Sequence, residues 1–195
     1  MGETTLNAFA ISTVVLFLAE FGDKSQLMAM ALAARYRTRT VVVGILIATF
    51  GGHALWVLVG TFAAGHLDPN VTKIVAGVAN LGFAAWTLRG DSLSDEERNR
   101  TESGGRWVLL TITITFLLSE FGDKTMVQTM TMGATHEPIG AWLGSSVGMA
   151  AADLLAIAAG TALASRVSPQ TIKYFAALFF ALFGLSLLAS AAGLV

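Results

Sequence analysis

The sequence contains no cysteine, which excludes disulfide bonds and thiolate metal sites. Charged residues make up only 13% of the 195 residues, about half the share in an average soluble domain. The formal net charge of −1 provides no polyelectrolyte surface for nucleic acid. No basic segment precedes the first hydrophobic run, so we expect no cleavable signal peptide. Hydrophobic residues make up 54%, which is typical of a chain that lies mostly in lipid.

Six hydrophobic segments are long enough to cross about 30 Å of hydrocarbon as helices. They are Leu6–Ala34, Val41–Ala64, Val71–Leu88, Trp107–Gly133, Ile139–Leu163 and Pro169–Leu194. A hydrophilic stretch, 89–106, divides them into two groups of three. The sequence therefore predicts an all-α polytopic membrane protein with a first three-helix repeat (1–88), a linker (89–106) and a second three-helix repeat (107–195).

Each group of segments contains one copy of the same motif. The sequence EFGDKS begins at residue 20, and EFGDKT begins at residue 120. Further identities keep this offset, among them Gly44 with Gly144 and Pro69 with Pro169. Because three spans are an odd number, the second group must enter the membrane from the opposite side. We therefore predict six transmembrane helices arranged as a 3+3 inverted-topology repeat.

Basic residues predict the orientation in the membrane. Connections on one side hold nine of them, and the connections on the other side hold only Lys73. The nine are Arg35, Arg37, Arg39, Arg89, Arg98, Arg100, Arg106, Arg166 and Lys173. By the positive-inside rule, we expect both termini outside and the central linker in the cytoplasm.

The motifs place four carboxylates and two lysines at bilayer depth, where charges are costly and usually mark an ion pathway. On a straight helix, Glu20 and Asp23 share one face, and inverted symmetry brings Glu120 and Asp123 opposite them. Four acids and two lysines sum to −2, which one divalent cation neutralises. Oxygen ligands without thiolates suit hard cations such as Ca²⁺, Mn²⁺ or Mg²⁺. We therefore predict a metal site formed by Glu20, Asp23, Glu120 and Asp123.

The glycines and hydroxyl residues of the motifs each allow two roles. Gly22 and Gly122 allow close helix packing or let the helix loosen. On a straight helix, Ser25 and Thr125 point away from the carboxylates and bond to a carbonyl four residues earlier. They become metal ligands only if the helix is distorted at the glycine, and both alternatives remain open.

Two glutamines and two lysines complete the motif regions. Gln26 lies near the polar face and offers an amide oxygen to the metal, whereas Gln128 is less well placed. Lys24 and Lys124 are predicted to modulate the site. In a purely structural alternative, each lysine pairs with the glutamate of its own motif, which would leave both aspartates unpaired in a low-dielectric core.

His53 and Asp153 occupy equivalent positions of the two repeats, deep in the second and fifth segments. Either could relay protons to the carboxylates. For His53, a role in packing is an equally good interpretation. For an aspartate at this depth, the functional role is favoured.

The doubled motif Glu-x-Gly-Asp-(Lys/Arg)-(Ser/Thr), in a six-span chain with a hydrophilic linker, resembles the family of small Mn²⁺/Ca²⁺ transporters. That family includes bacterial MneA-type and cyanobacterial Mnx-type manganese exporters and the Golgi cation/proton exchangers of yeast and human. The resemblance covers essentially the whole chain and implies that the four motif carboxylates bind the cation. Many members have Gln directly after the Ser/Thr. This chain has Gln26 there but Met126 in the second copy, which puts a ligand role for Gln128 in doubt.

The expected function is the export of a divalent cation, Mn²⁺ before Ca²⁺, in exchange for protons. Burial and mutual repulsion favour protonated carboxylates in the empty site, and metal binding expels those protons. The short length resembles the bacterial members and implies the plasma (inner) membrane. The expected partners are the cation, protons and the lipid bilayer, without nucleic acid or a bound cofactor, and a homo-oligomer is compatible with the sequence.

Two other classes of protein share part of this pattern. Intramembrane aspartyl proteases use Gly-Asp in two helices, but their pattern is Gly-x-Gly-Asp, and Glu20 stands where the first glycine belongs. A small-solute exporter, for example of basic amino acids, can have similar inverted halves, but it needs no mirrored Glu/Asp pairs. We therefore expect a transporter and not an enzyme.

The orientation can be tested by labelling, since the chain has no cysteine of its own. Cysteines introduced by Thr4→Cys and Ser94→Cys should react with a membrane-impermeant maleimide from opposite sides of the membrane. Labelling of both positions from the same side would contradict the inverted repeat and the orientation together.

Overall fold

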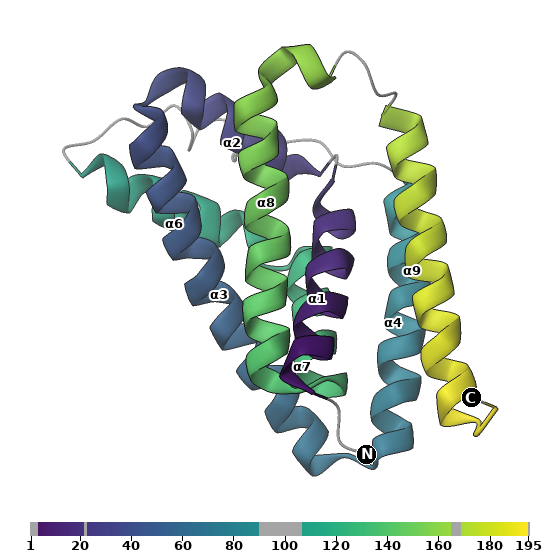
Figure 1. Cartoon of the computed structure of the whole chain (residues 1–195). Coiled ribbons are helices and arrows are strands. Elements are labelled where there is room, and N and C mark those ends of the chain that lie inside the picture. The colour runs from purple at the N-terminus through teal and green to yellow at the C-terminus, as the bar shows by residue number, and fades with distance from the viewer. Residues whose placement is uncertain (1–3, 22, 90–106, 165–168, 195) are drawn as a thin grey trace.

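The protein is all-helical in the computed structural model, which describes residues 4–21, 23–89, 107–164 and 169–194. Within these ranges there are eight helices and no strand (Figure 1). They are α1 (Thr5–Glu20), α2 (Lys24–Arg35), α3 (Thr38–His66), α4 (Pro69–Arg89), α6 (Val108–Glu120), α7 (Lys124–Thr135), α8 (Pro138–Ala164) and α9 (Pro169–Ala191). Beyond Arg89, the predicted linker lies outside the described residues, as do Gly22 and Arg166.

Both motifs interrupt the helix in which they were expected to lie. Helix α1 ends at Glu20, α2 begins at Lys24, and the two helices are bent by 74°. Helices α6 and α7 are separated at the equivalent residues. Gly122 has φ +78°, a conformation that residues with a Cβ rarely adopt. Of the two alternatives that the sequence left open, a straight helix and a helix distorted at the glycine, the structure shows the second, because the chain turns at the motif in each repeat.

Two described helices meet the length and apolarity needed to cross a bilayer by themselves, α3 and the Pro138–Ala158 part of α8. The bent pair α1–α2 makes a third if it is counted as one span. Helix α4 covers the third predicted segment, and α9 covers the sixth as far as Ala191. The described helices are thus consistent with a membrane protein, and the count of six spans remains a prediction.

Helices from the two halves of the chain pack against each other. Helix α1 lies along α8, α4 along α9, and α3 along both α6 and α7. Small residues bring α1 and α8 close: a Cβ added at Gly140, Gly144 or Gly148 would lie 2.3–2.4 Å from a carbonyl oxygen of α1. Glycine at every fourth position is the pattern that lets membrane helices approach closely. The two termini lie at one end of the molecule, opposite the α2–α3 connection (Figure 1).

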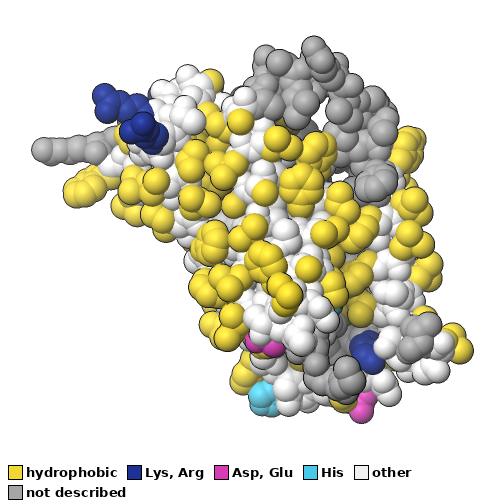
Figure 2. Space-filling view, viewed as in Figure 1, with side chains coloured by type: hydrophobic (Ala, Val, Ile, Leu, Met, Phe, Trp, Pro, Cys, Tyr) yellow, Lys and Arg dark blue, Asp and Glu magenta, His cyan; other side chains and the backbone are white. Residues whose placement is uncertain are grey.

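The outer surface is largely apolar. Figure 2 shows hydrophobic side chains over the sides of the helices, and charged side chains near the two ends. Large residues such as Leu58 and Phe62 are about two-thirds exposed (66% and 69%). Exposed apolar side chains of this kind suit contact with lipid acyl chains.

The α1–α8 contact predicts a stability difference between two glycine substitutions. Gly144→Leu should destabilise the protein by roughly 1–3 kcal/mol, since the new side chain would overlap the α1 backbone. Gly51→Leu is the control, because a Cβ there meets nothing within 4 Å. Thermal unfolding of the purified proteins in detergent measures the difference. Equal melting temperatures would contradict the close approach of the two helices.

Candidate cation site

The four predicted metal ligands are all buried in the interior of the helical bundle. Glu20 and Glu120 are the last residues of α1 and α6, whereas Asp23 and Asp123 are the N-caps of α2 and α7. Each side chain belongs to a residue that is at most 6% exposed. Glu20 lies within electrostatic range of Glu120 and Asp23. The two motif breaks thus bring acids from both halves of the chain into one buried region.

The two lysines connect the motifs across the halves. Lys24 Nζ lies 3.9 Å from Asp123 Oδ1, and Lys124 Nζ lies 2.5 Å from Asp23 Oδ1. The side chain of Lys124 is 5% exposed and that of Lys24 is 17% exposed, so the Lys124–Asp23 pair is the shorter and more deeply buried one. If each lysine paired with the glutamate of its own motif, the two aspartates would have no counter-charge. Instead, each aspartate has the lysine of the opposite motif.

The break in the helix also decides the position of the hydroxyl groups. Thr125 Oγ1 donates a hydrogen bond to Glu20 Oε2 at 3.2 Å, so Thr125 faces a carboxylate of the other half. This is the orientation that the sequence allowed only for a distorted helix. Ser25 is fully buried, and its hydroxyl has no hydrogen-bond partner among the described residues.

The two glutamines differ in their surroundings. Gln26 Nε2 donates to the carbonyl oxygen of Ala152 at 2.8 Å and so joins α2 to α8. Gln128 is fully buried, and neither its amide nitrogen nor its amide oxygen has a hydrogen-bond partner in the part of the chain that is described. A buried amide without a partner is costly, so Gln128 has polar atoms that could serve a ligand.

His53 has a partner that the sequence did not indicate. Its Nδ1 lies 3.1 Å from Ser145 Oγ, and the same hydroxyl donates to the carbonyl oxygen of Trp142. Because a hydroxyl has one hydrogen, Ser145 then accepts from the Nδ1–H of His53. This arrangement fits the packing interpretation of His53. No feature of the sequence singled out Ser145, which lies 92 residues from His53.

Asp153 is the fifth buried acid of this region. It is 0% exposed, and neither of its carboxylate oxygens has a hydrogen-bond partner within the described ranges. It lies within electrostatic range of both Glu20 and Glu120. The backbone just before it, at Ala152, receives the Gln26 hydrogen bond, which fixes α8 against the first motif.

The donor set suits a hard cation, although its ligands are not gathered around one point. Within the described ranges, no group of three or more His, Asp or Glu side chains has a metal-binding arrangement. Several buried carboxylate oxygens have no hydrogen-bond donor there: Glu20 Oε1, both oxygens of Glu120 and Asp123 Oδ2. Such oxygens are costly as bare anions and are stabilised by a proton or by a cation.

Comparison with known proteins agrees with this chemistry. A family model described as "Divalent cation/proton antiporter GDT1" matches residues 8–95 and 108–194. A Vibrio cholerae protein named "Putative manganese exporter" is 33% identical over 187 residues, which cover 94% of this chain and 92% of that protein. The Synechocystis "GDT1-like protein sll0615" is 26% identical, with 91% of this chain and 95% of that protein covered.

A plant relative is longer. "Protein PAM71, chloroplastic" of Arabidopsis thaliana is 28% identical over 91% of this chain, which spans 55% of that protein. No solved structure matches the chain. The family description and the name of the Vibrio relative are those of an antiporter and an exporter, which confirms the prediction of a cation transporter and not an enzyme. Since the family model covers most of the sequence, and the doubled motif occurs in both matched segments, the chain belongs to the GDT1 family of divalent cation/proton antiporters.

Proposed function

We propose that this protein exports a divalent cation, Mn²⁺ in preference to Ca²⁺, in exchange for protons. The cation binds near the membrane midplane between Glu20, Asp23, Glu120 and Asp123. The observation that carries this proposal is the burial of these four acids, from both halves, around reciprocal lysine–aspartate pairs. The name of the Vibrio relative supports manganese as the substrate.

The two halves form an inverted 3+3 repeat, with units 1–88 and 107–195 joined by the linker 89–106. Two observations support this arrangement. The segments that the family model matches begin one hundred residues apart, at 8 and 108. In addition, the α1–α8 and α2–α8 contacts have counterparts at the equivalent helices, α6–α3 and α7–α3. Rocking of one half against the other then exposes the site to each side in turn.

The charge of the site explains why the cation would be exchanged for protons. The four motif acids and two lysines sum to −2, so the site is neutral with one divalent cation or with two protons. In the empty carrier, Lys24 and Lys124 hold the aspartates, and protons neutralise Glu20 and Glu120. A cation that binds all four acids must displace both the protons and the lysine ammonium groups.

Neighbouring polar groups complete the site. Thr125, Ser25 and Gln128 supply further oxygen ligands, and Gln26 positions α2 against α8. Asp153 relays protons, since it is buried near both glutamates. His53 has the weaker claim to this role because it is hydrogen-bonded to Ser145.

The protein lies in the plasma membrane with both termini outside. The termini share one end of the molecule, as an even number of spans requires, and Arg35, Arg37 and Arg39 are exposed at the α2–α3 connection at the opposite end (Figure 1). By the positive-inside rule this arginine-bearing end faces the cytoplasm. An inward proton gradient then drives export of the cation.

Removing one carboxylate charge tests the site. Glu20→Gln and Glu120→Gln should each lower ⁵⁴Mn²⁺ uptake into inverted vesicles at least tenfold, since each substitution removes an anionic ligand from the site. Melting temperatures should stay close to that of the parent protein. Near-normal transport by either variant would remove that residue from the site.

Glu137→Gln is the matched control for these variants. Glu137 accepts hydrogen bonds from the backbone N–H groups of Gly140 and Ile139, and these bonds hold its pKa below its usual range. Gln retains an acceptor for the same N–H groups, so helix α8 keeps its cap. The same chemical change outside the site should leave transport within about twofold of the parent rate.

Proton exchange is tested with an imposed pH gradient. In inverted vesicles with an acidic lumen, ⁵⁴Mn²⁺ accumulation should require the gradient and stop when an uncoupler is added. Asp153→Asn should slow this exchange more than it weakens Mn²⁺ binding, if Asp153 relays protons. Asp68→Asn is the control, since Asn can still accept the backbone hydrogen bonds of Asn70 and Val71. Metal flux that does not depend on the pH gradient would contradict cation/proton exchange and would indicate a uniporter or a channel.

A further inference from the structure

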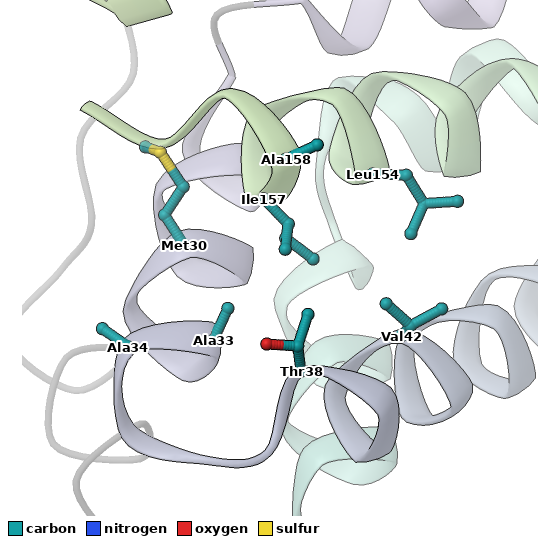
Figure 3. Close-up of a pocket in the computed structure, with 8 residues that line it drawn as sticks. All are labelled: Met30, Ala33, Ala34, Thr38, Val42, Leu154, Ile157 and Ala158. Atoms are coloured by element: carbon teal, nitrogen blue, oxygen red, sulfur yellow. The ribbon is translucent and has the colours of Figure 1, made fainter. Parts of the chain in front are cut away.

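A pocket of about 600 Å³ lies between α2, the start of α3 and α8 (Figure 3). Among the described residues, those that line it are Met30, Ala33, Ala34, Thr38, Val42, Leu154, Ile157 and Ala158. Only one of the eight, Thr38, has a polar side chain. The volume lies within the range of about 300–1,000 Å³ that is usual for small-molecule sites. The pocket therefore suits an apolar group of considerable size.

The chain next to the pocket is strongly basic. Arg35 follows the lining residue Ala34, and Arg37 and Arg39 flank Thr38 on either side. All three arginines are exposed. The guanidinium of Arg35 lies 5.7 Å from the centre of the Tyr36 ring. Residues 24–67 contain no Asp or Glu, so this part of the chain provides no carboxylate to neutralise the arginines.

This charge decides what can enter the pocket. Three exposed guanidinium groups repel a divalent cation, so the pocket is a poor entrance for the transported metal. They attract an anion, and the planar guanidinium binds phosphate oxygens in pairs. A molecule with a long apolar part and an anionic phosphate fits both the apolar pocket and the neighbouring arginines.

We propose that this pocket binds an anionic phospholipid of the surrounding bilayer. One acyl chain fills the apolar pocket, and the phosphate group is bound by Arg35, Arg37 and Arg39. Basic residues at the membrane surface each contribute to the attraction of anionic lipids. A zwitterionic lipid has the same acyl chains without the net negative charge, so it binds more weakly.

The site has a structural consequence for the first motif. Helix α2 begins directly after the motif break, and it forms one wall of the pocket while α8 forms another. The Gln26–Ala152 hydrogen bond already joins these two helices. A bound lipid adds a second connection between α2 and α8, on the arginine side of the motif.

Native mass spectrometry of the full chain in detergent tests the proposal with two lipids, phosphatidylglycerol and phosphatidylcholine. The parent protein should retain at least one phosphatidylglycerol and no comparable phosphatidylcholine. The triple variant Arg35→Gln, Arg37→Gln, Arg39→Gln should bind phosphatidylglycerol roughly 10- to 100-fold more weakly. The matching triple Lys variant keeps the charge but loses the paired hydrogen bonds of the guanidinium groups, so its affinity should lie between those of the parent protein and the triple Gln variant.

Filling the pocket is the second arm of the test. Ala158→Trp should abolish the retained phosphatidylglycerol, whereas Ala63→Trp, on an exposed position near the other end of α3, should not. If Ala158→Trp fails to fold, Ala34→Leu at the exposed rim replaces it. Equal retention of both lipids, or unchanged retention after the pocket is filled, would overturn the proposal. Because the readout is binding, failure of this test leaves the transport proposal intact.

Discussion

The cost of burying charge is the constraint on which the rest of this structure depends. Four carboxylates and Lys124 lie in the interior of an apolar bundle, with Lys24 partly exposed beside them, and each unpaired buried charge would be strongly destabilising. The structure lowers this cost with ion pairs between the two halves: Lys24 lies beside Asp123, and Lys124 lies beside Asp23. Each half therefore needs the other to stabilise its own motif. The close helix contacts, such as that of α1 with the glycines of α8, keep the two halves together.

The helix breaks place the two aspartates and the two glutamates at opposite kinds of helix end. Asp23 and Asp123 are N-caps, and the positive end of a helix dipole stabilises a carboxylate. Glu20 and Glu120 lie at the opposite kind of helix end, where the carbonyl groups point outward. Interrupted helices with both kinds of end facing one region are typical of ion sites in transporters. A continuous helix would have satisfied its own backbone and offered neither end to the site.

Much of the candidate site could be predicted from the sequence. The doubled motif identified Glu20 and Asp23 with their repeat counterparts, and burial of all four is consistent with that prediction. The sequence allowed a break at the motif but did not decide for it, because long apolar runs on both sides favour one helix and a single glycine is compatible with either form. The positive φ of Gly122 is a property of the folded backbone, which no local pattern specified.

Composition and repetition, which are properties of the sequence alone, predicted a helical membrane protein that handles ions, and the match to the family model places the chain in the GDT1 family. Only the tertiary structure decided which side chains from the two halves contact each other. Lys24 is the covalent neighbour of Asp23 and yet lies by Asp123, because the turn at the motif directs the start of α2 toward the opposite half. The contacts of Thr125 with Glu20 and of His53 with Ser145 likewise join residues about a hundred positions apart. Such pairings depend on how helices pack in space, and a hydrophobic pattern specifies the apolar face of a helix but not its partner.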